Sequence, residues 1–262
     1  MDLDLTGKHA LVCGASQGIG KAAAQALAAH GAAVTLVARD AAALAAVRAT
    51  LPTAHGQRHD FLSADFDRPD GLRALLATAL PTLPPVAILV NNSGGPAGGP
   101  AAAASTDEYL ETFTRHLLCN QILVQAVLPA MRAARWGRIV NVISTSVKEP
   151  IKGLGVSNTT RGAVASWAKT LSHELGPDNV TVNNVLPGFT RTRRLEDVFA
   201  SRMARTGATR AAVEAEALAE IPLGRFAEPH EIADAILFLC SPAAGYVSGV
   251  SLAVDGGRIR GL

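Results

Sequence analysis

The chain has 262 residues, of which 48% are hydrophobic and only 4% aromatic, and its formal net charge at pH 7 is +2. A chain of this length buries enough surface to fold without disulfide or metal staples. Its arginines are scattered and not interleaved with aromatic residues, which argues against a nucleic-acid partner. No uninterrupted apolar run approaches the roughly 18 residues of a membrane span, and residues 1–8 carry two aspartates, so we expect neither a membrane segment nor a signal peptide.

The three cysteines, Cys13, Cys119 and Cys240, are odd in number and show neither metal-ligand nor disulfide spacing. Such residues behave as small buried hydrophobes in a reducing compartment. The sequence therefore predicts a cytoplasmic protein with no metal site.

Short β-branched apolar runs alternate with Ala-rich amphipathic stretches along the whole chain. This alternation is typical of a parallel sheet that is covered by helices on both faces. The predicted strands are residues 9–13, 33–37, 57–61, 86–91, 137–143, 181–185 and 251–254. The predicted helices lie near residues 20–30, 41–51, 69–79, 106–134, 154–175 and 229–240. No break in composition divides the pattern, so we predict one doubly wound α/β domain over residues 1–262, with a seven-stranded parallel sheet.

Residues 189–222 interrupt this rhythm with a long polar and Ala-rich insert that contains a cap-like Thr209. The insert follows the sixth predicted strand, and ligands of open α/β sheets bind outside the carboxyl ends of the strands. We therefore expect a small helical lid over the substrate. A pair of surface helices without a functional role is the alternative.

The sequence CGASQGIG, residues 13–20, directly follows the first predicted strand and opens the first helix. Gly14, Gly18 and Gly20 permit a tight turn and close helix packing, which brings backbone N–H groups to a diphosphate at the helix N-terminus. A glycine cluster alone is weak evidence, but its place at the first strand-to-helix turn favours a dinucleotide site.

The end of the second predicted strand should meet the adenosine ribose, and Arg39 and Asp40 stand there. An acidic side chain would bind the two ribose hydroxyls, whereas an arginine would receive a 2′-phosphate. Asp40 resembles the N-cap of the following helix, so Arg39 is the favoured contact. The sequence thus predicts NADP(H) as the preferred cofactor, with NAD(H) as the alternative.

Several further motifs accompany the glycine turn in order along the chain. They are Asp65-Phe66, the NNSG run at residues 91–94, Pro187-Gly188 with Thr190 and Thr192, and the tail from PLGR at residues 222–225 to DGG at residues 255–257. Together they resemble the short-chain dehydrogenase/reductase family, nearest to its β-ketoacyl-carrier-protein reductase branch. The resemblance covers essentially the whole chain.

This resemblance implies a Rossmann fold, a small-molecule substrate and assembly as a homodimer or homotetramer. Relatives pair through the helices at 106–134 and 154–175, although the apolar face of Leu123, Val127 and Met131 is equally compatible with core packing. The implied cofactor-binding residues are Gly14, Ser16, Gln17, Gly18, Ile19, Gly20, Arg39, Asp65, Phe66, Asn92, Ser93, Gly94, Arg161, Pro187, Gly188, Thr190 and Thr192.

The catalytic positions depart from the family pattern, in which asparagine, serine, tyrosine and lysine act together. The resemblance places the family serine on Ser144, but Ser157 stands where the tyrosine is usual and Arg161 where the lysine is usual. His116 occupies the asparagine position. We predict Ser144, Ser157, Arg161 and His116 as the catalytic candidates of a divergent branch.

These substitutions change the available chemistry. The Ser157 alcohol is far less acidic and shorter than a phenol, and an arginine is effectively never deprotonated, although Arg161 can hold positive charge beside the nicotinamide ribose. His116 titrates in the useful range and could supply a proton, or it could be a helix histidine bonded to the backbone. The only tyrosines, Tyr109 and Tyr246, are expected to be packing residues.

Three functions follow from this pattern. The first is an NADP(H)-dependent oxidoreductase that acts on a carbonyl or alcohol, or a related C=N or C=C group, by an atypical mechanism. The second is a catalytically weak or inactive NADP(H)-binding sensor or scaffold. The third is a non-redox isomerase or lyase that uses the same pocket.

Overall fold

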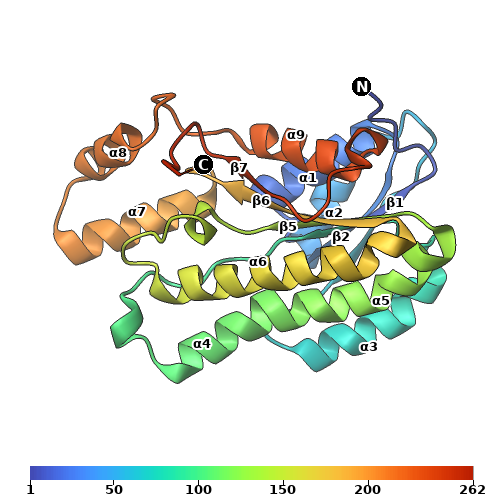
Figure 1. The fold of residues 1–262 in the computed structure, drawn as a ribbon, viewed down its shortest axis with the longest axis horizontal. Helices are drawn as coiled ribbons and strands as arrows, with labels where there is room; N and C mark the ends of the chain where they lie inside the picture. Colours follow the sequence, from blue (N-terminus) through green and yellow to red (C-terminus); the bar gives the residue numbers. More distant parts are fainter. Residues whose placement is uncertain (262) are drawn as a thin grey trace.

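The computed structural model describes residues 1–261. Seven parallel strands form one sheet in the order β3-β2-β1-β4-β5-β6-β7, with helices on both faces (Figure 1). The strands are β1 His9–Cys13, β2 Ala33–Ala38, β3 Asp60–Ser63, β4 Ile88–Asn91, β5 Gly137–Val142, β6 Val180–Pro187 and β7 Ser251–Val254. The predicted doubly wound, seven-stranded α/β fold is confirmed.

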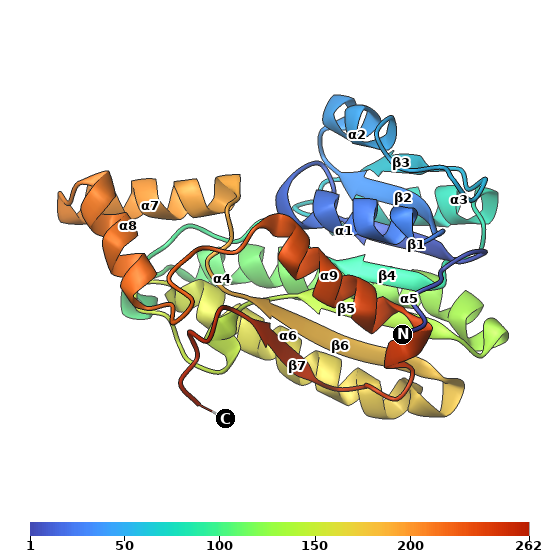
Figure 2. The same cartoon turned by 90° about the horizontal axis from the view of Figure 1, so that it is seen from above.

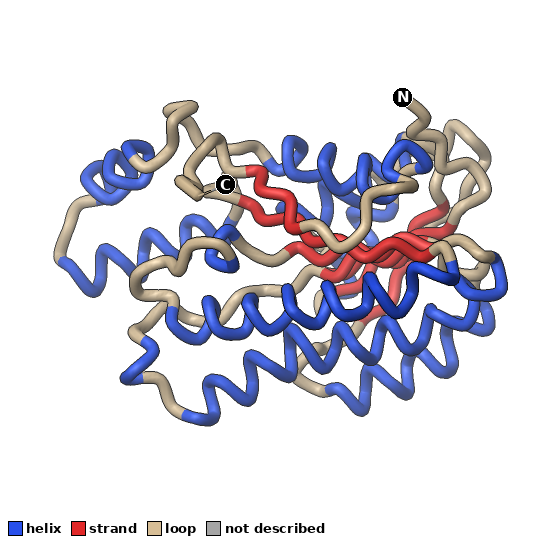
Figure 3. Tube along the Cα trace, viewed as in Figure 1, coloured by secondary structure: helices blue, strands red, loops and turns tan. Residues whose placement is uncertain are grey.

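Two layers of helices sandwich the sheet, as the tube in Figure 3 shows. The helices are α1 Gly18–Ala29, α2 Ala41–Arg48, α3 Pro69–Ala79, α4 Thr106–Phe113, α5 Cys119–Ala134, α6 Gly155–Leu175, α7 Arg193–Thr206, α8 Arg210–Ala219 and α9 Pro229–Cys240. One core cluster joins the sheet to α1, α2 and α9, and a second joins its other face to α3, α5 and α6. Figure 2 shows the sheet from above, with β1 between β2 and β4. The strand order reverses between β1 and β4, and ligands of such sheets bind at this kind of switch point.

The third predicted strand lies three residues too early, because β3 begins at Asp60 and pairs with Thr35 of β2. Side chains in the segment just before β3 form hydrogen bonds with the chain around β2. The ring of His59 accepts a hydrogen bond from the backbone N–H of Val34 at 3.1 Å, and Gln57 donates to the carbonyl of Ala28 at 2.7 Å. These side-chain bonds take the place of backbone pairing there.

The single helix predicted over residues 106–134 contains a break. A π-helical turn, Thr114–Leu118, separates α4 from α5 and carries His116. π-turns insert one extra residue and frequently mark functional sites. Residues Thr106–Ala134 also form the one helical stretch within 1–261 that is long and apolar enough to cross a membrane by length and composition. Its residues Leu123, Val127 and Met131 are buried in the core, so packing against the sheet explains their apolar character.

The predicted burial of the cysteines is confirmed, since Cys13, Cys119 and Cys240 are all buried with free thiols. Burial raises the pKa of Cys119 to about 11 and that of Cys240 to about 12, so neither is a thiolate at neutral pH. The expectation for Tyr246 is wrong, because its side chain is fully exposed beside β7.

Buried asparagines form a ladder across the middle of the sheet. Asn91 of β4 donates to Asn141 of β5 at 2.8 Å, Asn141 donates to Asn184 of β6 at 3.0 Å, and Asn184 donates to Ser251 of β7 at 3.1 Å. Asn141 has no exposed surface. Since each amide satisfies the next, the ladder fixes the register of the strands that carry the substrate half of the molecule.

The insert after β6 has a small core of its own. Helices α7 and α8 bury Leu195, Phe199, Val213 and Ala217 against each other, and the Phe189, Phe199 and Phe226 rings lie 5.8–6.4 Å apart between centroids. Thr209 caps α8 by accepting from Ala212 N–H, as its sequence predicts. The insert is therefore an ordered helical unit at the carboxyl end of β6.

Candidate active site

A cleft of about 1610 Å³ runs along the carboxyl ends of the strands, from the glycine turn to α7. Its floor at one end is the turn at Gly14, Gly18 and Gly20. Gly14 and Gly18 adopt φ of +60° and +57°, and a Cβ on Gly20 would collide with the carbonyl oxygen of Gly14. Glycine is therefore required here for a turn that holds α1 close to β1.

The N-terminus of α1 has no side-chain cap. Gln17 occupies the N-cap position in an extended conformation without a cap hydrogen bond, and no acidic residue stands in the first turn. Ser16, Gln17, Gly18 and Ile19 all line the cleft. The first N–H groups of the helix are consequently left to an anionic ligand, which the helix dipole also favours. The residues present fit a diphosphate at this place.

The end of β2 resolves the competition between Arg39 and Asp40. The Asp40 carboxylate accepts from Ala43 N–H at 2.9 Å as the N-cap of α2, whereas Arg39 is exposed and lines the cleft. The capping role predicted for Asp40 is confirmed, and Arg39 is left to face a ligand.

Asp65 and Phe66 also line the cleft, beyond β3. The Phe66 ring packs into the core, so its backbone is what a ligand would meet, and the Asp65 carboxylate accepts from the N–H of Asp67 at 3.1 Å.

The NNSG segment after β4 joins the glycine turn to the opposite wall. Asn92 donates to the carbonyls of Cys13 and Gly14 at 3.3 and 3.4 Å, and Ser93 bonds to His116. A Cβ on Gly94 would meet nothing within 4 Å, so the backbone there opens directly onto the cleft.

The segment after β6 forms the other side. Gly188 packs against Asp255, where a Cβ would lie 2.7 Å from the Asp255 Cα, and Thr190 donates to the Gly188 carbonyl at 3.1 Å. The methyl group of Thr192 lies where it would contact a Cβ on Gly18 at 3.2 Å. Pro187, Gly188, Thr190 and Thr192 therefore close the cleft over the glycine turn.

Ser144 follows β5, Ser157 and Arg161 belong to α6, and all three line the same cleft. Ser144 is half-buried and accepts from Ser146 N–H at 3.1 Å, whereas Ser157 is only 8% exposed. Arg161 donates to the carbonyl of Val142 at 2.8 Å, and its Nε has no partner within residues 1–261. Burial, and next the charge of Arg194, lower the pKa of Arg161 to about 10, so this guanidinium stays protonated at neutral pH.

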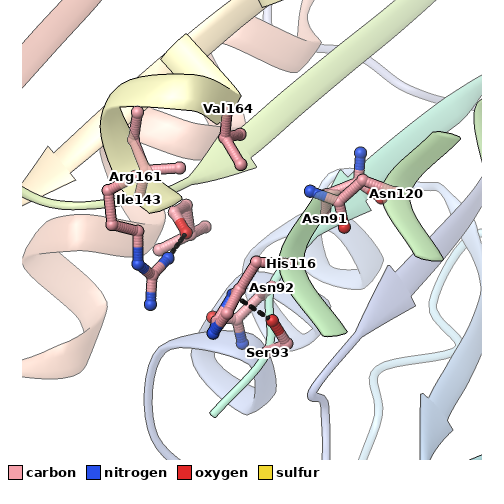
Figure 4. Close-up of a pocket in the computed structure, with 9 residues that line it drawn as sticks. Asn91, Asn92, Ser93, His116, Asn120, Ile143, Arg161 and Val164 are labelled. Atoms are coloured by element: carbon pink, nitrogen blue, oxygen red, sulfur yellow. Dashed lines mark hydrogen bonds between the residues drawn. The ribbon is translucent and has the colours of Figure 1, made fainter. Parts of the chain in front are cut away.

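His116 of the π-turn lines a small pocket together with Ser93 and Arg161 (Figure 4). Its Nδ1 lies 2.7 Å from the Ser93 hydroxyl, and its Nε2 is buried without a partner in the described chain. Burial, followed by the charge of Arg161, lowers the pKa of His116 well below its ordinary value. Burial therefore favours the neutral imidazole at physiological pH, in contrast to the titration in the useful range that the sequence alone suggested for His116. Its side-chain partner is Ser93, and a backbone hydrogen bond to Gly94 opposes part of the lowering of the His116 pKa.

The structure adds Arg194, which the sequence reasoning missed. It belongs to the first turn of α7, lines the cleft, and acts electrostatically on both Arg161 and His116. The basic run Arg191-Thr192-Arg193-Arg194 at the start of the insert is the signal that could have found it. Within residues 1–261, no three His, Cys, Asp or Glu side chains gather as metal ligands.

The fold and the cleft define a class: a doubly wound α/β protein with a glycine-rich turn beneath its ligand cleft. Residues 14–258 match the family model described as enoyl-(acyl carrier protein) reductase. A 3-oxoacyl-[acyl-carrier-protein] reductase, FabG, of Vibrio harveyi is 33% identical over 97% of this chain and 98% of that protein. The chain belongs to the short-chain dehydrogenase/reductase family.

Solved structures agree with this assignment. L-sorbose reductase from Gluconobacter frateurii, complexed with NADPH and L-sorbose, is 30% identical and superposes with a TM-score of 0.92 over 100% of both chains. YwfH, an NADPH-dependent reductase involved in bacilysin biosynthesis, is 25% identical with a TM-score of 0.90 over 97% of this chain and 99% of that one.

Proposed function

We propose that this protein is an NADP(H)-dependent oxidoreductase that interconverts a carbonyl and an alcohol, or reduces a related C=N or C=C group, on a small molecule. The observation that carries this proposal is the uncapped N-terminus of α1 above the Gly14–Gly20 turn, opening onto one continuous cleft that reaches Arg161 and Ser157. The Vibrio harveyi relative is named for reduction of a 3-oxoacyl group, and two structural relatives are described with NADPH.

The residues along the cleft suit a phosphorylated dinucleotide. The first amides of α1 would hold the diphosphate, and Arg39 at the end of β2 would hold a 2′-phosphate, while Asp40 is occupied as a helix cap. Asp65, Phe66 and Asn92 to Gly94 would border the adenosine and the ribose, and Pro187 to Thr192 the nicotinamide. When bound, the cofactor supplies or accepts the hydride.

The chain's own residues would then handle the charge on the substrate oxygen. Ser144 and Ser157 offer hydroxyl hydrogen bonds, and the protonated Arg161 stabilises negative charge that develops there. A serine hydroxyl is too weak an acid to replace a phenol. We therefore propose that the enzyme stabilises the oxyanion electrostatically and takes its proton from water or from the substrate.

His116 contributes to this arrangement as a neutral imidazole. If Ser93 donates to Nδ1, the proton resides on Nε2, which faces the small polar space shared with Asn91, Asn120 and Arg161. We propose that this N–H helps to orient the polar groups beside Arg161, because the space that it faces is too small for a water. Helices α7 and α8, with the rest of 189–222, would close over the substrate as a lid.

The direct test is nucleotide titration followed by a substrate screen. Fluorescence titration should give an NADPH affinity well above that for NADH, and carbonyl, imine and enone panels should show loss of NADPH absorbance with at least one class. Binding without turnover on any class would favour a sensor, and substrate conversion without net cofactor oxidation would favour a non-redox enzyme. No affinity for either nucleotide at millimolar concentration would overturn the proposal.

The role of His116 is tested separately by kinetics of His116→Gln and His116→Ala. We expect kcat to fall in both, with a smaller loss for glutamine, because its amide can still donate a hydrogen bond. An unchanged rate and pH profile would remove His116 from the mechanism.

A further inference from the structure

We propose that the substrate is an organic acid, and that Arg194 of α7 and Arg161 of α6 bind its carboxylate beside the reacting carbon. This inference rests on the proposed oxidoreductase function and deepens it by naming the substrate class. It follows from the position of two unpaired guanidinium groups in the substrate half of the cleft.

Arg194 is held over the loop that follows β4. Its Nη2 donates to the carbonyl of Pro96 at 2.7 Å, and the guanidinium lies against Gly95, where a Cβ would meet it at 3.1–3.4 Å. The side chain is half-buried. A glycine at position 95 therefore lets the flat guanidinium settle on the backbone, and α7 is tied to the cleft wall through it.

Neither Arg161 nor Arg194 lies within 4.0 Å of a carboxylate in residues 1–261. Other arginines of the same region are paired. Arg202 bonds to Glu216, Arg210 to Glu196, and Arg258 to Glu220. Of the cleft-lining arginines without a carboxylate partner in residues 1–261, Arg39, Arg193 and Arg205 are exposed, whereas Arg161 is buried and Arg194 is half-buried. A missing counter-ion therefore matters most for Arg161 and Arg194.

The electrostatic environment makes this absence of a counter-ion costly. The charge of Arg194 lowers the pKa of Arg161 and of His116. The charges of Arg161 and Arg115 also lower the pKa of His116. Like charges in a partly buried cleft repel one another, and desolvated charges destabilise the fold unless they are paired. A bound carboxylate would relieve both penalties, since its two oxygens match the forked donors of a guanidinium.

The reacting group would lie next to this pair. Ser144 and Ser157 line the same part of the cleft as Arg161, so an acid held by Arg194 would bring a nearby carbonyl carbon to the two hydroxyls. Arg161 would serve both the carboxylate and the developing oxyanion. Keto acids and hydroxy acids of short length meet this geometry.

The cofactor's diphosphate is the competing source of negative charge, because Thr192, two residues before Arg194, contacts the glycine turn at Gly18. The two sources predict different losses. If Arg194 serves the substrate, its removal weakens carboxylate binding and spares NADPH; if it serves the diphosphate, its removal weakens NADPH.

The test compares acids with their neutral esters. Acetoacetate and levulinate, and their methyl esters, are titrated calorimetrically into the full-length protein with and without NADP⁺, alongside NADPH titrations of each variant. We expect the acids to bind at least about tenfold tighter than the esters. In Arg194→Gln we expect this ratio of acid affinity to ester affinity to fall by about tenfold. Arg194→Lys should retain part of it, because the charge stays but the planar fork is lost.

Arg68→Gln is the charge-matched control, because Arg68 is exposed, has no ion pair in residues 1–261 and does not line the cleft. We expect it to change the acid preference by less than about twofold. Thermal unfolding of each variant confirms that it is folded.

Equal binding of acid and ester by the unmodified protein, or no binding of either acid at about 10 mM, would overturn the organic-acid proposal. So would an Arg194→Gln variant that keeps the acid preference while losing NADPH affinity, which would assign Arg194 to the diphosphate. These results leave the oxidoreductase proposal standing, because that proposal is decided by the nucleotide titration and the substrate screen.

Discussion

The two halves of the cleft are built on different principles. Around β1, β2 and α1 the ligand surface is mostly backbone: the Gly14, Gly18 and Gly20 turn and the uncapped amides of α1. Around β5, α6 and α7 it is mostly side chain, with Ser157, Arg161 and Arg194 facing the cleft.

This contrast explains where the chain could diverge. A backbone site tolerates few replacements, because any Cβ on Gly20 collides with Gly14. A side-chain site can exchange its chemistry while the fold persists, which would allow Ser157 and Arg161 to stand at the positions where the sequence resemblance expects tyrosine and lysine. Function on this fold is decided at the site and not by the architecture.

We expect the largest effect from Gly20→Val, which changes the half of the cleft that is built from backbone. The added branched side chain cannot fit beside the Gly14 carbonyl, so the turn must open. We expect NADPH affinity to fall by more than about 100-fold and the midpoint of thermal unfolding to drop. Fluorescence titration and calorimetry measure both. A variant that binds NADPH normally would show that the turn is not the nucleotide platform.

The asparagine ladder joins strands β4 to β7, and Asn141→Leu removes the residue that connects Asn91 to Asn184. Asn91 then loses an acceptor and Asn184 a donor inside the sheet. The unfolding free energy should decrease by about 2–4 kcal/mol, from two unsatisfied buried amides. Urea denaturation measures this value. Loss below about 0.5 kcal/mol would mean that water or repacking satisfies both partners.

Arg39→Gln should change cofactor choice alone. Arg39 is exposed and has no ion pair within residues 1–261, so its removal costs the fold little. We expect the preference for NADPH over NADH to shrink by about 10–100-fold, the usual loss for a charge-assisted phosphate contact. Parallel titrations with the two nucleotides measure it. An unchanged ratio would remove Arg39 from the 2′-phosphate site.

The smallest expected effect is a pH dependence of stability that originates in the catalytic half. His116 has a lowered folded pKa, because burial and next Arg161 disfavour its charged form. Below the unfolded pKa of about 6.5 the unfolded chain takes up a proton that the folded chain refuses, so stability falls as the pH decreases.

His116→Gln should flatten this dependence between about pH 7 and pH 5, by up to about 1 kcal/mol per pH unit. Chemical denaturation of both proteins at several pH values measures the difference in slope. His9 also has a lowered pKa through burial, so a residual slope is expected in the variant. Identical slopes would show that His116 is not protected from protonation.

Local patterns in the sequence determined much of this protein. The alternation of apolar runs and helices predicted every strand region and the parallel sheet, and the Gly14–Gly20 spacing predicted the turn. Asp40 was recognised as a helix cap from its place before an Ala-rich segment. These features depend on neighbouring residues, because turn geometry, capping and helix periodicity are short-range effects.

Long-range contacts decided the rest. The side chains of Gln57 and His59 take the place of strand pairing before Asp60, where β3 begins. A π-helical turn at Thr114–Leu118 divides the predicted long helix into two. Only the folded chain buries that imidazole against Ser93 and brings Arg194 of the insert to Arg161. Such desolvation and charge effects depend on groups far apart in the chain, which is why the sequence alone could not assign them.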